Sequence, residues 1–159
     1  MKNKIYMKNK IYFASPFFNP EQVEREERLK TKLRDLGFEV FSPKEAYFCK
    51  PDEGDEVRQM VFDGNCKAIQ ECDILFAVTD GKDMGTIWEA GYANGINSVV
   101  YPSKKKIIVY YCETLPEGGK FNLMLAQSGD IIITDFLDMD QLPNLIKSGE
   151  VKKYHGEIE

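Results

Sequence analysis

The chain has 159 residues, a length typical of one globular domain, and its 43% apolar content is enough for a hydrophobic core. The formal net charge of −5 argues against a nucleic-acid polymer as partner, because phosphate backbones attract basic surfaces. Small neutral or cationic substrates remain compatible with this charge.

Location and metal content are inferred from features that the sequence lacks. No run of about 18 apolar residues is present, so no membrane span is expected. The N-terminus lacks the continuous apolar core of a secretory signal, which favours a cytoplasmic protein. The four cysteines form no Cys-x-x-Cys pair and His155 is the single histidine, so we expect free thiols and no metal site.

The first six residues are repeated identically at residues 7–12. Such a short repeat cannot be a solenoid unit, so we interpret residues 1–9 as an N-terminal extension with a duplicated start. No linker divides the rest of the chain. We therefore expect one domain at residues 10–150 and a charged, mobile tail at residues 151–159.

Apolar runs between turn residues predict strands, and apolar residues at helical spacing predict helices between them. The expected strands are residues 10–15, 38–42, 73–79, 106–111 and 130–134. The expected helices are residues 20–36, 55–71, 121–127, 139–147 and one that begins near Met84. This alternation predicts a single-domain, Rossmann-like or flavodoxin-like parallel sheet of about five strands with helices on both faces.

Three parts of this prediction rest on particular residues. Asn19 can cap the first helix, with Pro20 at its first position. Residues 43–54 are expected to form a long loop, and residues 98–101 are a second, less favoured strand candidate. The apolar anchors expected in the helix at 55–71 are Val57, Met60, Val61 and Ile69.

The helix after the strand at 73–79 carries the candidate active residue, Glu89. A carboxylate just beyond such a strand lies where open α/β sheets bind ligands, so Asp73, Asp83 and Glu89 are all expected near this crevice. A carboxylate can displace a leaving group from an anomeric carbon and hold the sugar covalently. The hydroxyl of Tyr12, at the end of the first strand, could keep Glu89 ionised by donating to it.

Structural roles remain open for the same residues. Asp83 could cap the helix, and Asp73 could serve the strand that it opens. Trp88 and Tyr92 could be ordinary core, and residues 122–124 could tie a loop. There is no Gly-x-Gly-x-x-Gly or P-loop signature, and no cofactor is expected.

Five segments, in this order, resemble the nucleoside 2-deoxyribosyltransferase family. They are residues 11–18, 40–43, 72–74, 83–93 and 122–124. The resemblance implies an enzyme of nucleoside salvage that moves 2-deoxyribose from a purine or pyrimidine deoxynucleoside to another free base. It further implies double displacement with retention, no cofactor, and dimers assembled into hexamers.

The resemblance also assigns roles to residues of this sequence. It implies Glu89 as the nucleophile and Tyr12 as its hydrogen-bond donor. It implies that Asp83 and Asn122 hold the 5′-hydroxyl of the sugar, with Asn122 supplied by a neighbouring subunit. Further substrate contacts are expected from Phe17, Gly85, Trp88 and Met124.

Two departures from the family pattern concern the base and the tail. Asn65 stands where the family often has an aspartate that handles protons of the base, and an amide cannot give and take a proton as a carboxyl does. Asp63 is the alternative base contact if the helix is shifted. At the C-terminus, Tyr154 is only a weak counterpart of the aromatic residue with which some members complete a neighbouring site.

Two other functions remain open. One is a hydrolase of the related deoxynucleoside 5′-monophosphate N-glycosidase group, which the anionic Asp83 disfavours because it would repel a phosphate dianion. The other is a nucleotide-sensing module without turnover, which would have no use for a Glu89–Tyr12 pair.

Overall fold

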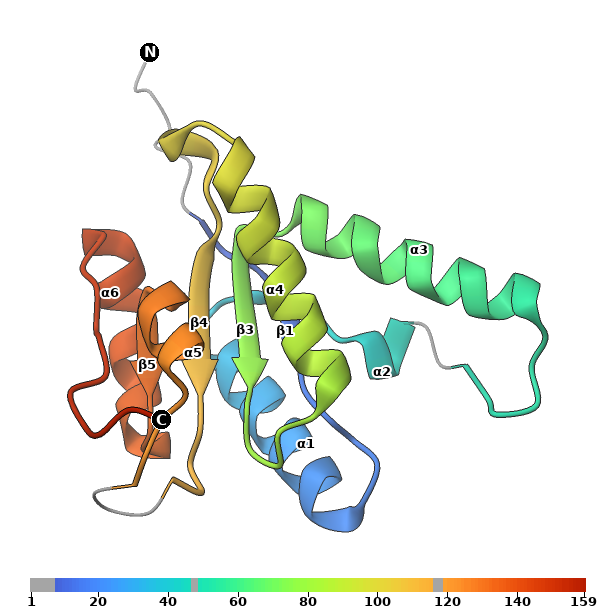
Figure 1. Ribbon diagram of the computed structural model, residues 1–159, viewed down its shortest axis with the longest axis horizontal. Helices are drawn as coiled ribbons and strands as arrows, with labels where there is room; N and C mark the ends of the chain where they lie inside the picture. The colour runs from blue at the N-terminus through green and yellow to red at the C-terminus, as the bar shows by residue number, and fades with distance from the viewer. Residues whose placement is uncertain (1–7, 47–48, 116–118) are drawn as a thin grey trace.

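The computed structural model describes residues 8–46, 49–115 and 119–159. Its centre is a parallel sheet with the strand order β2-β1-β3-β4-β5 (Figure 1). The strands are β1 (Lys10–Ala14), β2 (Glu39–Phe41), β3 (Ile74–Val78), β4 (Ile107–Tyr111) and β5 (Ile131–Ile133). The α-helices are α1 (Pro20–Asp35), α2 (Pro43–Ala46), α3 (Asp55–Glu71), α4 (Met84–Val99), α5 (Leu123–Ser128) and α6 (Leu142–Ser148).

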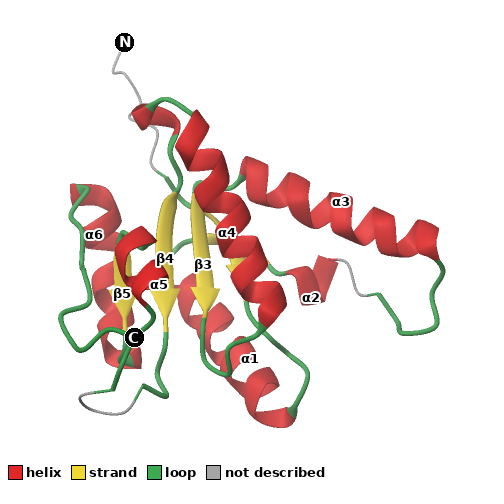
Figure 2. Ribbon diagram, in the orientation of Figure 1, coloured by secondary structure: helices red, strands yellow, loops and turns green. Residues whose placement is uncertain are grey.

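Helices cover both faces of the sheet, as Figure 2 shows, and this confirms the predicted fold class. Strand residues alternate between the two faces, so each face has its own apolar cluster. On one face the strands pack against Leu29 and Leu33 of α1 and against Leu142 of α6. On the other face they pack against Ile69 of α3 and Ala90 of α4, together with α5. The short 3₁₀ helices η1 (Pro102–Lys104) and η2 (Phe136–Gln141) complete the connections.

The strand order changes direction at β1, which has β2 on one side and β3 on the other. In open α/β sheets, ligands bind in the crevice beyond the carboxyl ends of the strands at such a switch point. The region around β1, β3 and the start of α4 is therefore the place that this fold offers to a small molecule.

Local signals account for the first helix. The Oδ1 atom of Asn19 accepts a hydrogen bond from the backbone N–H of Gln22 at 2.9 Å, and Pro20 occupies the first helical position. After the helix, Gly37 has φ +94°, a conformation that side chains with a Cβ rarely adopt. The predicted start and end of α1 are thus confirmed.

Two predicted connections differ from the structure. The stretch expected as a loop at 43–54 begins with the one-turn helix α2, while its residues 47–48 lie outside the described part. Residues 98–101 form no strand, because α4 continues through Val99 and η1 comes next. The preferred strand at 106–111 is confirmed as β4. The duplicated residues 1–6 and residues 116–118 also lie outside the described ranges.

The apolar anchors expected for α3 are mostly wrong. Ile69 is its one buried residue, and Met60 is 56% exposed. The reason is visible in Figure 1, where the N-terminal half of α3 extends beyond the sheet. Only the last turns of α3 therefore reach the core of this chain.

The C-terminal tail is paired with the domain. The backbone N–H of Ile132 donates to Lys152 at 2.8 Å, and Phe121 forms a parallel bridge with Ile158. Residues 151–159 were expected to form a mobile tail, but they pair with β5 and with the segment that precedes α5. Among the described residues no helix is long and apolar enough to cross a membrane, and no cluster of His, Cys, Asp or Glu could hold a metal ion. All four cysteines are free thiols.

Candidate active site

Glu89 and Tyr12 form a hydrogen-bonded pair between α4 and β1. The phenolic oxygen of Tyr12 donates to Oε1 of Glu89 at 2.8 Å. The approach is possible because α4 packs on the sheet through Ala90 and Ala93, whose small side chains are fully buried. This close helix–sheet contact brings a carboxylate from the helix onto a hydroxyl from the strand.

The charge state of this pair depends on burial. Burial raises the pKa of the Glu89 carboxyl, the hydrogen bond from Tyr12 lowers it, and the charge of Asp83 raises it again, so that the pKa lies at about 7. Burial and the neighbouring carboxylate raise the pKa of Tyr12, so its hydroxyl remains a donor. Glu89 is therefore ionised in a substantial fraction of molecules at neutral pH and is poorly solvated, as a nucleophile should be.

Tyr12 is held in place by a residue that sequence reasoning missed. Phe41 lies directly opposite Tyr12 in the β1–β2 register, and their rings stack with centroids 5.5 Å apart. The Tyr12 side chain is completely buried, so the ring has little freedom to turn away from Glu89. The sequence of residues 38–42 predicts a strand, but it does not show which residue of that strand lies opposite Tyr12, because this depends on the register.

Asp83 caps α4, as its structural interpretation proposed. Its Oδ2 atom accepts hydrogen bonds from the backbone N–H of Thr86 at 2.8 Å and from the Thr86 hydroxyl at 2.9 Å. A Cβ at Gly85 would lie 3.3 Å from the same oxygen, so glycine allows the carboxylate to sit close to the helix start. Both hydrogen bonds use Oδ2, which leaves Oδ1 available to a ligand. The negative charge of Asp83 also raises the pKa of the Glu89 carboxyl.

The two candidate base contacts on α3 have different surroundings. The Oδ1 atom of Asn65 is buried and has no hydrogen-bond partner among the described residues. Asp63 is exposed and accepts a hydrogen bond from Gln59 at 2.8 Å, one turn earlier on the same helix. Next to Asn65, burial and the charges of Asp63 and Glu89 raise the pKa of the Cys66 thiol. Sequence reasoning did not single out Cys66, which lies within electrostatic range of Glu89.

Trp88 belongs to an aromatic group on the outside of α3 and α4. Its ring stacks on Tyr92 with centroids 5.4 Å apart and contacts Phe62 of α3 at 5.4 Å. Trp88 is half exposed, so its side chain is not the ordinary core that its helical spacing allowed. The ring is open to a ligand or to another protein surface.

Asn122 and Met124 lie at the start of α5. Asn122 caps that helix, because its Oδ1 atom accepts hydrogen bonds from the backbone N–H groups of Met124 at 3.0 Å and Leu125 at 3.3 Å. The backbone of Glu159 pairs with this segment, and its carboxylate lies 3.6 Å from Nζ of Lys82. Asn122 is thereby connected to the residue that precedes Asp83. The Met124 side chain is exposed.

Phe17 and Asp73 lie at opposite ends of the strands. Phe17 comes after the carboxyl end of β1, and its ring contacts Phe18 at 5.0 Å. Asp73 precedes β3, and its Oδ2 atom accepts hydrogen bonds from the backbone of Lys10 at 3.0 Å and Asn9 at 3.2 Å. The expectation that Asp73 lies near the crevice was therefore wrong, because it ties the amino ends of two strands together.

Comparison with known proteins identifies the family. A family profile described as Nucleoside 2-deoxyribosyltransferase matches residues 11–125, which is more than half of the chain. The chain belongs to this family of enzymes. The matched range contains Tyr12, Glu89 and Asn122 and ends before the C-terminal tail.

Two solved structures resemble this chain. A 2-deoxyribosyltransferase from the psychrotolerant bacterium Bacillus psychrosaccharolyticus is 31% identical, with a TM-score of 0.75 over 92% of this chain and 99% of that chain. A conserved protein from Enterococcus faecalis V583 shares the fold at 18% identity, with a TM-score of 0.64 over 89% and 98% of the two chains. Curated protein sequences give no match.

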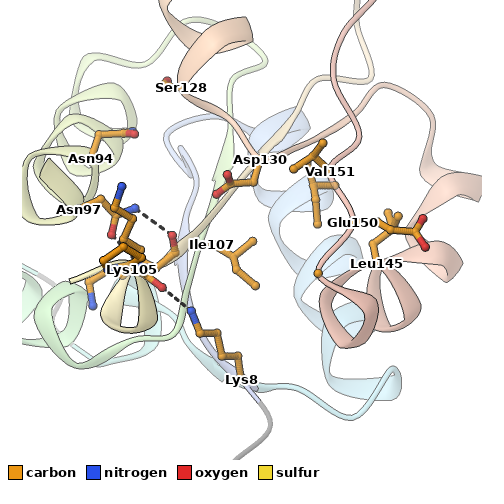
Figure 3. A pocket seen from close by; sticks show the side chains of 14 residues that line it. Lys8, Asn94, Asn97, Lys105, Ile107, Ser128, Asp130, Leu145, Glu150 and Val151 are labelled. Carbon is orange, nitrogen blue, oxygen red and sulfur yellow. Dashed lines mark hydrogen bonds between the residues drawn. The ribbon is translucent and has the colours of Figure 1, made fainter. Parts of the chain in front are cut away.

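A cavity of about 330 Å³ lies elsewhere in this protein, at the amino ends of β4 and β5 (Figure 3). The Asn97 side chain there is occupied by the backbone of Lys106, donating at 2.9 Å and accepting at 2.7 Å. Nζ of Lys8 donates to the Lys105 carbonyl, and the acidic Asp130 and Glu150 balance these lysines. The cavity is remote from the carboxyl ends of the strands, and the side chains of Asn97, Lys8 and Asp130 already have partners within the chain.

Proposed function

We propose that this enzyme transfers 2-deoxyribose from a 2′-deoxynucleoside to a free purine or pyrimidine base through a covalent ester of Glu89. The observation that carries the proposal is the partly buried Glu89 carboxylate, with Tyr12 donating to it at 2.8 Å. A solvated surface glutamate would not be held in this way by a fully buried tyrosine.

The reaction has two displacements at C1′ of the sugar. In the first, a carboxylate oxygen of Glu89 forms a bond to C1′, and the bond from C1′ to the base nitrogen breaks, with its electron pair leaving on the base. In the second, a nitrogen of the incoming base attacks C1′ and the ester bond breaks, which regenerates the carboxylate. The departing base gains a proton from solvent and the incoming base loses one. Each step inverts C1′, so the product retains the configuration of the substrate.

Other residues are assigned to binding. We propose that Oδ1 of Asp83 and the amide of Asn122 hold the 5′-hydroxyl, since both residues cap helices with one oxygen and keep hydrogen-bonding capacity. Gly85 leaves space beside Asp83, and Phe17, Trp88 and Met124 offer apolar surface to the sugar and base. The reaction requires no cofactor.

We also propose that the enzyme acts in nucleoside salvage in the cytoplasm as a homo-oligomer whose site is shared between subunits. Free cysteines are typical of a reducing compartment, which supports the location. The half-exposed Trp88 and the largely exposed Met124, both assigned to the site, support an assembly that covers them.

The test is chromatography of 2′-deoxyuridine and adenine after incubation with the purified protein. Formation of 2′-deoxyadenosine and uracil supports transfer, whereas uracil without a new nucleoside indicates a hydrolase. Glu89→Gln should abolish exchange, because an amide cannot form the ester. The matched control is Glu71→Gln, at an exposed glutamate of α3, which should leave exchange unchanged. Full exchange by Glu89→Gln would refute the mechanism.

A further inference from the structure

A buried group of charged side chains, which the proposed mechanism does not use, lies between α1 and the end of β2. Glu26 and Lys30 of α1 are 1% and 2% exposed. The carboxylate of Glu26 accepts hydrogen bonds from Nζ of Lys30 at 3.1 Å and from Nζ of Lys44 at 3.3 Å. It also accepts one from the hydroxyl of Ser42 at 3.1 Å. Because burial removes the hydration of charged groups, such a cluster adds little net stability. What it does in this fold is hold Ser42 in one position.

Ser42 is held through its side chain and through its backbone. It is buried and immediately follows β2. Its carbonyl oxygen accepts hydrogen bonds from the backbone N–H groups of Glu45 at 3.1 Å and Ala46 at 3.0 Å, and these bonds form the single turn of α2. Nζ of Lys30 also lies 2.9 Å from Oε1 of Glu45, so the same lysine joins α1 to α2. The carboxyl end of β2 is therefore anchored to α1 as well as to the neighbouring strand.

This anchor lies on the face of the sheet opposite the Tyr12–Glu89 pair. Glu26 is on the buried side of α1, which packs against one face, and Tyr12 belongs to the apolar cluster of the other face. Successive strand residues point to opposite faces. With Ser42 directed at Glu26, the preceding Phe41 is directed at Tyr12, and the two rings stack at an interplanar angle of 21°.

The pairing of β1 with β2 is too short to fix Phe41 by itself. β2 has three residues, and Phe41, opposite Tyr12, is the last of them. Among the described residues, β2 pairs with β1 alone. The end of a short edge strand opens easily, because few contacts hold it. The hydrogen bond between Ser42 and Glu26 closes this end.

We propose that the buried contact between Glu26 and Ser42 positions the nucleophile from the opposite face of the sheet. It does so by holding the ring of Phe41 against Tyr12. Both are positioning residues, because they act through Tyr12 and not on the substrate. Without the contact, the Tyr12 ring is held less firmly and its hydrogen bond to Glu89 weakens, since such bonds depend steeply on distance and angle. The effect on exchange rests on the proposed function, whereas the effect on the Glu89 carboxyl does not.

The direct test is the pKa of Glu89 in Ser42→Ala protein, measured by NMR titration of the carboxyl carbon and assigned with Glu89→Gln. We expect this pKa to increase by about half a unit, because a weaker hydrogen bond from Tyr12 stabilises the carboxylate less. Ser42→Thr keeps a hydroxyl and should restore the wild-type value. The groups that interact with the Glu89 charge are Tyr12, Asp83 and Cys66, and neither variant replaces any of them. An unchanged pKa in Ser42→Ala would overturn the inference.

A double-mutant cycle tests the route through Phe41. Phe41→Leu should raise the pKa of Glu89, and adding Ser42→Ala should then change it little, because the ring through which Ser42 acts is gone. Additive shifts would show another route and would also overturn the inference. Glu26→Met, which lacks the acceptor, should behave as Ser42→Ala does. The control is Glu113→Gln, which breaks a charged contact of α1 away from β2 and should leave the pKa of Glu89 unchanged.

Exchange between 2′-deoxyuridine and adenine separates this inference from the proposed function. Ser42→Ala should lower kcat about threefold at neutral pH, leave KM unchanged and move the acidic limb of the pH profile to higher pH. If the wild type lacks exchange but Ser42→Ala still raises the pKa of Glu89, the proposed function fails and the inference stands. A lower kcat with the limb in its wild-type position would mean a structural role for Ser42 and would contradict the inference.

Discussion

Glu89 is a carboxyl group whose surroundings oppose its charge. Its pKa is raised to about 7 by burial and by Asp83, against the favourable hydrogen bond from Tyr12. Because the nucleophile must be ionised, kcat/KM should fall about tenfold per pH unit below pH 7 and reach a plateau above it. A pH profile with 2′-deoxyuridine as substrate measures this. A flat profile between pH 5 and 8 would contradict it.

Tyr12→Phe should move the acidic limb of that profile. The phenol stabilises the charged form of Glu89, so its removal raises the pKa of the carboxyl and shifts the limb to higher pH. We also expect exchange on the plateau to slow by roughly 5- to 10-fold, because one hydrogen bond that orients the nucleophile is lost. Tyr101→Phe, at an exposed tyrosine, is the control. If only the plateau falls, Tyr12 orients Glu89 without affecting its charge.

The same pKa predicts an effect on stability with the opposite sign to that on activity. A carboxyl with a raised folded pKa loses stability as pH increases from about 4.5 to about 7, because the unfolded chain releases the proton more readily. Glu89→Gln removes this loss, so the inactive variant should be more stable than the wild type at pH 8, by up to about 3 kcal/mol. Denaturant unfolding at pH 4 and pH 8 checks this. A less stable variant at pH 8 would show that the carboxylate is not strained.

At the scale of elements, Glu113 joins α1 to the end of β4. It accepts hydrogen bonds from Arg25 at 2.8 Å, Arg28 at 2.8 Å and the Tyr111 hydroxyl at 2.6 Å. Burial alone would raise the pKa of Glu113, but these donors outweigh it and lower the pKa to about 2. The connection holds the carboxyl end of β4, from which the chain continues towards Asn122.

Glu113→Gln should lower the free energy of unfolding by about 2 kcal/mol at pH 7, since two arginines lose a charged partner. A depressed carboxyl pKa stabilises above the unfolded pKa, and this contribution is lost as pH falls from about 4.5 to about 2. The difference between variant and wild type should therefore shrink in that interval. Glu150→Gln, at an exposed site, is the control. A difference that is independent of pH would mean that packing, and not charge, is lost.

Elements with strong local signals could be predicted, and elements defined by contacts could not. Asn19, Pro20 and Gly37 mark the limits of α1 in the sequence itself. In contrast, Met60 is apolar at a helical spacing and yet exposed, because periodicity does not show how far a helix extends past its sheet. Helix α2 is too short for any periodic signal.

The candidate site divides in the same way. Glu89 and Tyr12 were predicted as a pair, and the structure places them in hydrogen-bond contact. The stacking of Phe41 on Tyr12 depends on the register of the two strands. The position of Asp73 depends on the end of the strands at which it lies. Neither is encoded in a local pattern. The roles assigned to these residues in catalysis stay predictions.

At the scale of the molecule, an apolar stripe runs along the outer side of α4. It comprises Phe62 of α3 with Trp88, Tyr92, Ile96 and Val99 of α4, and it forms a shallow groove around the last four residues. Contiguous apolar surface of this kind marks protein contacts. We therefore expect the enzyme to exceed 18.3 kDa in solution, through an interface on this stripe.

Light scattering after size-exclusion chromatography measures that mass. Val99→Lys places a charge on a side chain that is 84% exposed and should dissociate the assembly towards 18.3 kDa. The control is Leu137→Lys, a comparably exposed residue of η2, which should leave the mass unchanged. A wild-type mass of one chain would refute self-association, and a dissociated but fully active Val99→Lys protein would refute a shared site.

The hydrogen bond between Tyr12 and Glu89 joins residues 77 positions apart in the chain. Closing such a loop has an entropic cost, and folds that depend on contacts between distant segments fold more slowly than folds rich in local contacts. The bond needs β1 and β3 to pair and α4 to dock, so we expect it to form only once these three elements are in place. During refolding, exchange activity should therefore return with the slowest packing step and never in a burst phase. The return of exchange activity would therefore measure the fraction of molecules in which folding is complete.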